Sequence, residues 1–357
     1  MNTRQSSPHR GPAVDVDCLK LTTYFGERDR TPGGLLADVL SDFFAKRRVR
    51  ASVLLRGAEG FGQLHHLHTD RLLSLSEGLP AVAVAIDTHE RIGELLDPHL
   101  NLARGALVTV ERARLLSGEI SPTRLPEQLG EATKLTLYLR RHERHERTPT
   151  FIALCELLHR RGLAGVTVLL GVDGTRDGQR TRARFFSRNT EVPLMLIAVG
   201  SGRQIAQVLP EIGQLLREPL LTLERVRVCK RDGELLARPH ELPDTDVRGV
   251  ELWQKLMIYT SQSATHEGHP LHIEIIKRLR VAGAAGATCL RGVWGFHGDH
   301  APHGDRFLQV RRGVPVLSVI VDTPTRIARW FAIVDELTTE HGLVTCEIVP
   351  TLHATDR

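Results

Sequence analysis

The stretch Lys20-Leu-Thr-Thr-Tyr24 returns twice along the chain, as Lys134-Leu-Thr-Leu-Tyr138 and Lys255-Leu-Met-Ile-Tyr259. A short apolar run ends in a glycine 37 residues after each of the three lysines. These glycines are Gly57, Gly171 and Gly292. A spacing kept in three copies predicts that one structural unit is repeated three times.

Two further markers keep the same register downstream of each glycine. A proline opens the next apolar run, and a glutamate follows it after 31 or 32 residues. The markers are Pro80 and Glu111, Pro193 and Glu224, and Pro315 and Glu347. Chance recurrence of common strand patterns is the alternative, and four markers in register favour duplication instead.

Within each unit the apolar residues change their period. The first run alternates, with Leu19 and Leu21 on one side and Lys20 and Thr22 on the other, which predicts a half-buried strand. The next segment has the i, i+4, i+8 spacing of a helix, as in Leu36, Leu40 and Phe44. Two strands, a second helix and a last strand complete the order β-α-β-β-α-β.

This order is typical of a ferredoxin-like fold, with both helices on one face of an antiparallel sheet. The predicted class is therefore α+β, with three tandem ferredoxin-like modules closing as a single-chain pseudo-trimer. We expect a disordered tail over residues 1–16 and linkers over 117–132 and 231–251. The modules themselves are expected at residues 17–116 (module 1), 133–230 (module 2) and 252–354 (module 3).

The sheet face opposite the helices carries a specific prediction. The first and last strands of such a module are neighbours, and their lysines and glutamates share one parity. We therefore expect three cross-strand pairs, Lys20–Glu111, Lys134–Glu224 and Lys255–Glu347. Ordinary solvated strand faces are the alternative.

Composition restricts the class of protein. The chain has 41% hydrophobic and 25% charged residues, a net charge of +5 and no long basic run. These values are typical of a soluble globular protein and do not favour nucleic-acid binding. The five cysteines form no CxxC pair, so we expect buried thiols in a reducing, cytoplasmic setting. No run approaches the length of a membrane span, and the first residues do not resemble a signal peptide.

Three stretches carry a resemblance to a known family. They are Leu19-Lys-Leu-Thr-Thr-Tyr-Phe-Gly-Glu-Arg-Asp-Arg30, Ser52-Val-Leu-Leu-Arg-Gly-Ala-Glu-Gly-Phe-Gly62 and Thr69-Asp-Arg-Leu-Leu-Ser-Leu-Ser-Glu-Gly-Leu-Pro80. Together with Leu290-Arg-Gly-Val-Trp-Gly-Phe296, they resemble the DUF190 family of PII-like proteins. Module 2 is the most divergent copy, with Thr175 where the others have phenylalanine.

The resemblance implies a PII-like fold, usually a homotrimer, with a loop after the second strand that contacts a partner. It also implies effector binding, often of an adenine nucleotide, in clefts between neighbouring subunits. The partner of such a protein is a membrane transporter or an enzyme. The chain has no TGxxGDGK-type stretch, so an adenine nucleotide is only weakly indicated here.

The glycine-rich turns are the candidate ligand sites. Glycines let a backbone approach a ligand and present N–H groups to an anion, and a neighbouring arginine adds a charged fork. A turn that simply needs glycine for its own conformation is the alternative. The candidates are Arg56, Gly57, Gly60, Phe61 and Gly62 in module 1, and Arg291, Gly292, Gly295 and Phe296 in module 3. Arg112 and Arg114 on the last strand of module 1 are further candidates, with structural ion pairing as their alternative use.

A histidine-rich segment raises the possibility of a metal site. His297, His300 and His303 have side chains that suit zinc or copper, although module 2 has no counterpart. A polar, partner-facing loop is the better interpretation. No GxSxG, HExxH or P-loop pattern is present, so we expect no enzyme.

The sequence therefore predicts a non-enzymatic, PII-like signalling and regulatory protein. It would sense a small anionic effector at inter-module clefts and contact a transporter or an enzyme through its loops. A metal-binding protein resembling the copper-tolerance relatives of PII, and a ligand-free scaffold, are the alternatives. Because the three-subunit surface is filled internally, we expect a monomer of 39.7 kDa.

Overall fold

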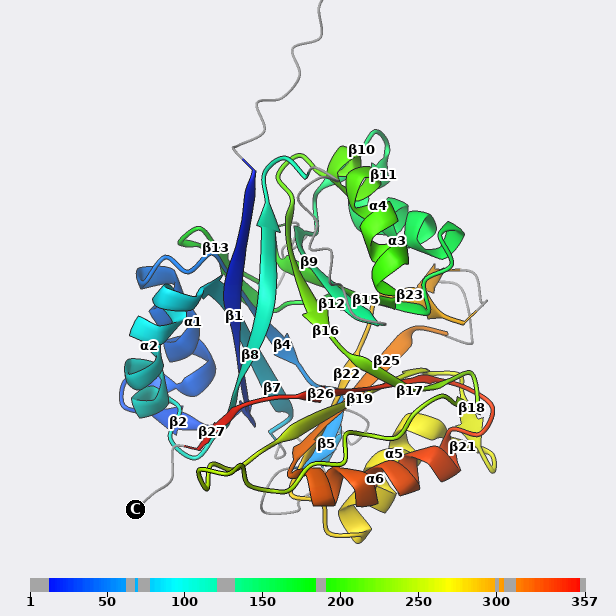
Figure 1. Cartoon of the computed structure of the whole chain (residues 1–357). Coiled ribbons are helices and arrows are strands. Elements are labelled where there is room, and N and C mark those ends of the chain that lie inside the picture. The colour runs from blue at the N-terminus through cyan, green and yellow to red at the C-terminus, as the bar shows by residue number, and fades with distance from the viewer. Residues whose placement is uncertain are drawn as a thin grey trace, which may run out of the picture.

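One order of elements is repeated in each module of the computed structural model (Figure 1). The structure describes residues 13–61, 68–69, 78–120, 132–183, 191–298, 302–304 and 313–353. Module 1 consists of β1 (Val14–Gly26), α1 (Leu36–Lys46), β4 (Ala51–Arg56), β7 (Pro80–Thr88), α2 (His89–Leu102) and β8 (Leu107–Ser117). Module 2 consists of β9 (Thr133–Arg140), α3 (Thr150–Arg160), β12 (Gly165–Leu170), β15 (Pro193–Gly200), α4 (Gly202–Leu215) and β16 (Leu220–Arg225). Module 3 consists of β19 (Gln254–Ser261), α5 (Leu271–Val281), β22 (Ala287–Arg291), β25 (Pro315–Asp322), α6 (Pro324–Leu337) and β26 (Leu343–Ile348).

Each module forms a mixed α/β unit dominated by its antiparallel sheet. In module 1 the strands lie in the order β4-β7-β1-β8, and the other two modules repeat that order. A short hairpin leads into the first helix of each module: β2–β3 (Arg30–Thr31, Gly34–Leu35), β10–β11 (Arg144–His145, Thr148–Pro149) and β20–β21 (Thr265–His266, His269–Pro270).

The N-termini of α2 and α6 are capped in different ways. Thr88 caps α2 by accepting a hydrogen bond from the backbone N–H of Arg91. The matching Thr323 makes no side-chain cap bond on α6. Asp244 from the preceding linker accepts the N–H of Thr325 there instead, while Asp322 accepts the indole N–H of Trp330.

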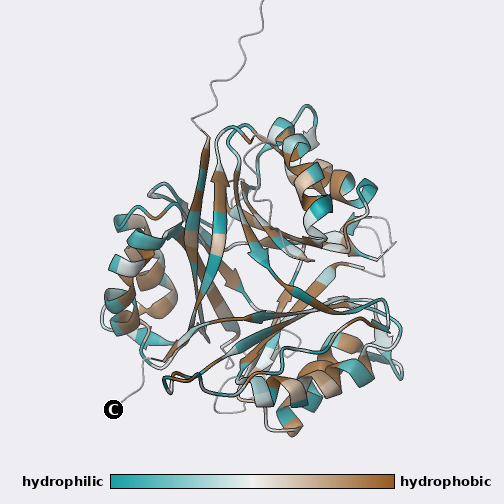
Figure 2. Ribbon diagram, viewed as in Figure 1, coloured by the Kyte–Doolittle hydropathy of each residue, from teal (hydrophilic) through white to brown (hydrophobic). Residues whose placement is uncertain are grey.

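The apolar residues form one central and three outer clusters. Each outer cluster lies between the sheet of one module and its two helices. The central cluster combines residues from all three modules, such as Val84, Ile197 and Val319. The helices therefore lie outside, and the second faces of the three sheets pack on one another (Figure 1). Figure 2 shows apolar residues along the strands and polar residues on the outer helix surfaces.

The strand that follows each marker glycine leaves its own module. β5 (Glu59–Phe61) pairs with β22 of module 3, β13 (Asp173–Arg176) with β4 of module 1, and β23 (Trp294–His297) with β12 of module 2. Short outer strands add to them: β6 (His68–Thr69), β14 (Gln179–Arg182) and β24 (His303–Gly304).

The chain beyond each marker glutamate also crosses to a neighbour. β8 pairs with β16, β17 (Arg227–Arg231) pairs with β26, and β27 (Thr351–His353) pairs with β8. β17 also pairs with β18 (Glu234–Leu235). Each pair of modules thus exchanges strands in both directions, which joins them into one 13-stranded and one 8-stranded sheet.

Two boundaries differ from the sequence predictions. β1 begins at Val14, inside the expected tail, because Val14 to Asp17 pair with the long end of β8. Arg231 and the pair Glu234–Leu235 lie in strands although a linker was expected there. All five cysteines are buried and unpaired by disulfides. Within the described ranges, no helix combines the length and the apolar character that a bilayer crossing requires.

Candidate functional site

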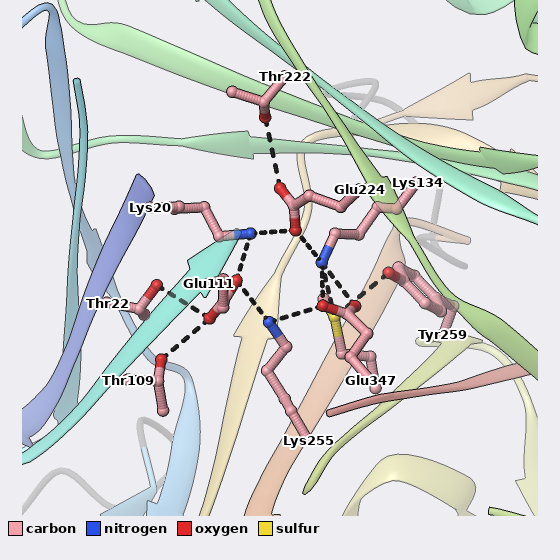
Figure 3. Close-up of polar contacts among 11 residues, drawn as sticks. Lys20, Thr22, Thr109, Glu111, Lys134, Thr222, Glu224, Lys255, Tyr259 and Glu347 are labelled. Carbon is pink, nitrogen blue, oxygen red and sulfur yellow. Dashed lines mark hydrogen bonds and ion pairs between the residues drawn. The ribbon is translucent and has the colours of Figure 1, made fainter. Parts of the chain in front are cut away.

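Six charged side chains meet where the three sheets converge (Figure 3). The lysines come from the first strand of each module and the glutamates from the last strand. The register places Lys20 opposite Glu111, Lys134 opposite Glu224 and Lys255 opposite Glu347. The three predicted cross-strand pairs are therefore confirmed, and the solvated alternative is wrong because all six residues are buried.

Each lysine also reaches the glutamate of a neighbouring module. Within the modules, Nζ–Oε distances are 2.5 Å for Lys20–Glu111, 2.6 Å for Lys134–Glu224 and 3.1 Å for Lys255–Glu347. Between modules, they are 2.5 Å for Lys20–Glu224, 2.5 Å for Lys134–Glu347 and 2.8 Å for Lys255–Glu111. The six contacts close a ring of alternating charge, here called the Lys–Glu ring.

Lysines and glutamates in the ring favour each other's charged forms. Burial alone raises the pKa of Glu111, but Lys20 and Lys255 reverse this and hold that pKa well below its usual range. Burial likewise lowers the pKa of Lys20, and the carboxylates of Glu111 and Glu224 reverse it and hold the pKa well above the usual range. Both groups are therefore charged at neutral pH. For Lys134, burial outweighs the attraction of Glu224 and Glu347 and lowers the pKa below its usual value, so this lysine holds its proton less firmly than Lys20. With three lysines and three glutamates, the ring has no formal net charge.

Hydroxyl groups satisfy the outer carboxylate oxygens. Thr109 and Thr22 donate to Oε1 of Glu111 at 2.9 and 3.4 Å, and Thr222 donates to Glu224 at 3.4 Å. Module 3 departs from this pattern, because Met257 occupies the position that Thr22 has in module 1. There both carboxylate oxygens of Glu347 accept from Lys134, at 2.5 and 2.6 Å.

A tyrosine from each first strand lies two residues beyond the ring threonine or methionine. Burial raises the pKa of Tyr24, Tyr138 and Tyr259, so these side chains remain neutral. The three ring glutamates also form the one carboxylate group in the described residues with ligand atoms close enough to share a metal ion. Three ammonium groups already neutralise these carboxylates, so we assign the ring a structural role.

The glycine turns lie where one module crosses to the next. The N–H of Gly57 donates to the carbonyl of Pro80 at 2.7 Å, and that of Gly292 donates to Pro315 at 2.8 Å. The next N–H in each turn donates to a strand of the neighbouring module, as Ala58 does to Cys289 at 2.8 Å. A Cβ atom on Gly60 would lie 2.5 Å from the carbonyl oxygen of Ala287. Close backbone packing thus explains these glycines, and the N–H groups are already in use.

The structure does bring two candidate arginines to one junction. β5 pairs with β22 up to Glu59 and Cys289, so the Arg56 turn and the Arg291 turn lie at the same end of that pairing. Both side chains are exposed, and Arg56 contacts Glu27 at 3.0 Å. Gly62 lies outside the described residues.

The remaining aromatic and last-strand candidates have structural contacts. Phe61 and Phe296 are buried in the outer clusters of modules 3 and 2, respectively. Arg114 pairs with Asp15 at 2.6 Å and Asp17 at 3.3 Å, while Arg112 is exposed. Arg114 thus matches the structural alternative that its pattern left open.

The histidine candidates are not assembled into a site by the described residues. His297 is buried on β23, opposite Gly165. His303 lies on β24 and its ring contacts the carbonyl of Gly313. His300 lies outside the described residues, so the metal hypothesis stays a prediction.

The comparisons with known proteins match the repeat. A family model described as DUF190, Uncharacterized ACR, COG1993, matches residues 18–115, 132–228 and 253–351. A UPF0166 protein from Aquifex aeolicus (strain VF5) is 29% identical over 99 residues, which cover 28% of this chain and 91% of that protein.

Among solved structures, an aspartate kinase from Synechocystis overlaps at 11% identity with a TM-score of 0.26, covering 96% of this chain and 45% of that one. The chain spans less than half the length of that kinase, and so weak an overlap establishes no shared fold. The three family matches, in contrast, coincide with the three copies of the repeat.

Proposed function

The chain belongs to the DUF190 family, and from this premise we propose that it is a non-enzymatic regulatory protein of the PII-like type. Its three ferredoxin-like modules would form a pseudo-trimer within one polypeptide. Its signal would be a small anionic effector, and its target a membrane transporter or an enzyme.

The arrangement of strands supports the fold part of the proposal. The order β4-β7-β1-β8, with α1 and α2 on one face, is what two right-handed β-α-β units produce. In the Lys–Glu ring, the lysine of each module contacts the glutamate of the next module around the axis. Closed threefold symmetry requires the same contact to recur between every pair of modules in this way.

The observation that carries the effector proposal is that the turns after Arg56 and Arg291 lie at the same end of the β5–β22 pairing, at the junction of modules 1 and 3. Two guanidinium groups from different modules can hold one anion in forked hydrogen bonds. Module 2 has Leu170 at the matching position, so the three junctions are unequal. Because the turn N–H groups are in use, the anion would be held by side chains.

The strand exchange supports coupling between the effector and the loops. β5 carries module 1 directly onto β22 of module 3 and directly precedes residue 62, where the sequence predicts the partner-facing loop. An anion that draws the two arginine turns together would therefore shift the base of that loop. Contact of such loops with a transporter or an enzyme remains part of the proposal.

A ligand-free scaffold is the second candidate, and a specific observation favours it. The N–H groups of Gly57 and Gly292 donate to protein carbonyls, and Arg56 already contacts Glu27. A protein whose polar groups are internally satisfied at the junction needs no ligand there.

A thermal-shift panel separates the two candidates. The panel would contain ATP, ADP, AMP, cyclic AMP, phosphate and sulfate. A ligand present at a hundredfold excess over its Kd stabilises the folded protein by about 2.7 kcal/mol. We expect at least one anion to raise the melting temperature, and Arg56→Ala and Arg291→Ala to remove the shift. Arg104→Ala, at an exposed arginine two residues beyond the end of α2, should leave the shift unchanged. A panel in which no anion moves the wild-type midpoint would leave the scaffold as the function.

A further inference from the structure

Two cysteines lie close together where a strand of module 2 pairs with module 3. Cys229 is on β17 and Cys346 is on β26, and these strands run side by side (Figure 1). The register places Cys346 opposite Arg227, two residues before Cys229. Both thiols are fully buried in the outer cluster of module 3, and both are free.

A β-bulge directs Cys229 into this cluster. The register between β17 and β26 shifts between Val228 and Lys230, so Cys229 is the extra residue of the bulge. The matching pairing of β8 with β16 runs without such a shift. The fold therefore does not require a bulge at this junction. Bulges recur where one side chain is re-aimed towards a functional site.

The other modules show that Cys346 is not required for packing either. Cys346 directly precedes the ring residue Glu347, and the residues that precede the other two ring glutamates are Val110 and Leu223. Both are buried and apolar. Packing as a small apolar side chain accounts for either cysteine alone. It does not account for a bulge that brings the second thiol to the first.

The two thiols contact each other as well as two oxygen atoms. The S–H of Cys346 donates to Oε1 of Gln254 at 3.2 Å, and that of Cys229 faces the carbonyl of Arg227 at 3.8 Å. Contact with the Cys229 thiol, together with burial, raises the pKa of Cys346 above its ordinary value. The Cys346 thiol therefore stays protonated while β17 is in place, and its reaction requires β17 to open.

β17 has the features of a strand that opens locally. Its pairing with β26 covers four residue pairs and is interrupted by the bulge, and on its other side β18 adds two pairs. Short, interrupted strands near a sheet edge open at a lower free energy than the core. Opening exposes Cys229 first, because β26 is also held by β19.

We propose that Cys229 and Cys346 form a redox-active dithiol site, which a peroxide oxidises to a disulfide between modules 2 and 3. In the opened state the Cys229 thiolate attacks one peroxide oxygen, the O–O bond breaks, and a sulfenic acid and water are formed. The Cys346 thiolate then attacks the sulfenic sulfur, the S–O bond breaks, and the oxygen leaves as a second water. The two thiol protons end on the two leaving oxygens, so two thiols and one hydrogen peroxide give one disulfide and two waters.

Oxidation would change how the linker over residues 231–251 is held. Cys346 loses its S–H and can no longer donate to Gln254. The side-chain amide of Gln254 donates to the carbonyl of His240 in that linker at 2.7 Å. The disulfide would also tie β17 to β26 covalently. The site includes neither Arg56 nor Arg291, so its test is independent of the effector.

The test treats the full-length protein with hydrogen peroxide at neutral pH, in buffer alone and in urea below the unfolding midpoint, where β17 opens more often. Free thiols are then alkylated, and mass spectrometry of a non-reducing digest maps the disulfides. Cys346→Val and Cys346→Leu install the residues that modules 1 and 2 carry, and their melting temperatures check the fold. Cys155→Ala is the matched control, because Cys155 is equally buried but lies in the outer cluster of module 2.

We expect a linked pair of peptides containing Cys229 and Cys346 in the wild type and in Cys155→Ala, and its loss on adding dithiothreitol. Hydrogen exchange of the β17 peptide should be at least about tenfold slower in the oxidised protein, because the disulfide opposes local opening. Cys346→Val and Cys346→Leu should show neither effect. Absence of the linked peptides in both buffers, equal linkage of Cys229 to other cysteines, or unchanged exchange of β17 after oxidation would overturn the proposal.

Discussion

Removing one carboxylate from the Lys–Glu ring should destabilise the protein far more than removing a surface carboxylate. Glu111→Gln leaves Lys20 and Lys255 with one carboxylate each and gives a buried cluster a net positive charge. The amide oxygen still accepts from Thr109, so the loss is mainly electrostatic. Breaking a buried ion pair in this way costs about 3–5 kcal/mol.

A second substitution isolates the cause. In Glu111→Gln/Lys255→Met the four remaining charges, Lys20, Glu224, Lys134 and Glu347, form a neutral open chain. The double variant should therefore be more stable than Glu111→Gln alone, by roughly 2 kcal/mol. This is expected because an unpaired buried charge accounts for most of the unfolding free energy that Glu111→Gln loses. Urea unfolding at pH 7, followed by circular dichroism, gives the free energies.

Glu94→Gln is the matched control, because Glu94 pairs with Arg91 on the exposed face of α2 at 3.2 Å. Its effect should stay within about 1 kcal/mol. A loss below 1 kcal/mol for Glu111→Gln, or a double variant less stable than the single one, would refute the assignment of the ring as a coupled unit.

Four further outcomes follow from the same structure. Light scattering should give a mass of 39.7 kDa, and a threefold larger species would contradict closure within one chain. The depressed pKa of Glu111 adds stability that is present above pH 4.5 and is lost as the pH falls further. The urea midpoint of Glu111→Gln should therefore depend less on pH below 4.5 than that of the wild type. Gly60→Ala should destabilise by about 1–3 kcal/mol through overpacking, whereas Gly93→Ala, at a helix site with open space, should be neutral or stabilising. Burial lowers the pKa of His99 to about 4, so stability should fall as the pH drops from 6.5 towards 4; an NMR titration that finds an ordinary histidine pKa would contradict this.

Side-chain patterns were sufficient to predict the repeat and the pairs inside the ring. The period-2 alternation fixes which face Lys20 and Glu111 share, and the strand order makes them neighbours. The second set of ring contacts, such as Lys20–Glu224, depends on how modules sit around the axis, which no local pattern encodes.

The strand exchanges were not predictable for a different reason. Backbone hydrogen bonds between β5 and β22 can form with almost any side chains, so the sequence does not show which strand β5 pairs with. The exception is the glycine, because only a residue without a Cβ atom lets Ala287 approach Gly60 so closely. The sequence pattern suggested an anion site at these glycines. In the structure the N–H groups of Gly57 and Gly292 donate to protein carbonyls, and a ligand at the junction stays a prediction.

The two-way strand exchange also sets the order in which the nascent protein can be completed. β8 emerges from the ribosome with an edge that β16 and β27 later cover, and β27 ends at His353. At about 5–20 residues per second, roughly 10–50 s separate the synthesis of Ser117 from that of β27. Until β27 is made, the part of the β8 edge from Leu107 to Thr109 lacks its partner strand, and an unpaired strand edge can pair with other chains. We therefore expect the nascent chain of three fused units to depend on chaperones during translation. The complete, folded protein should not need them.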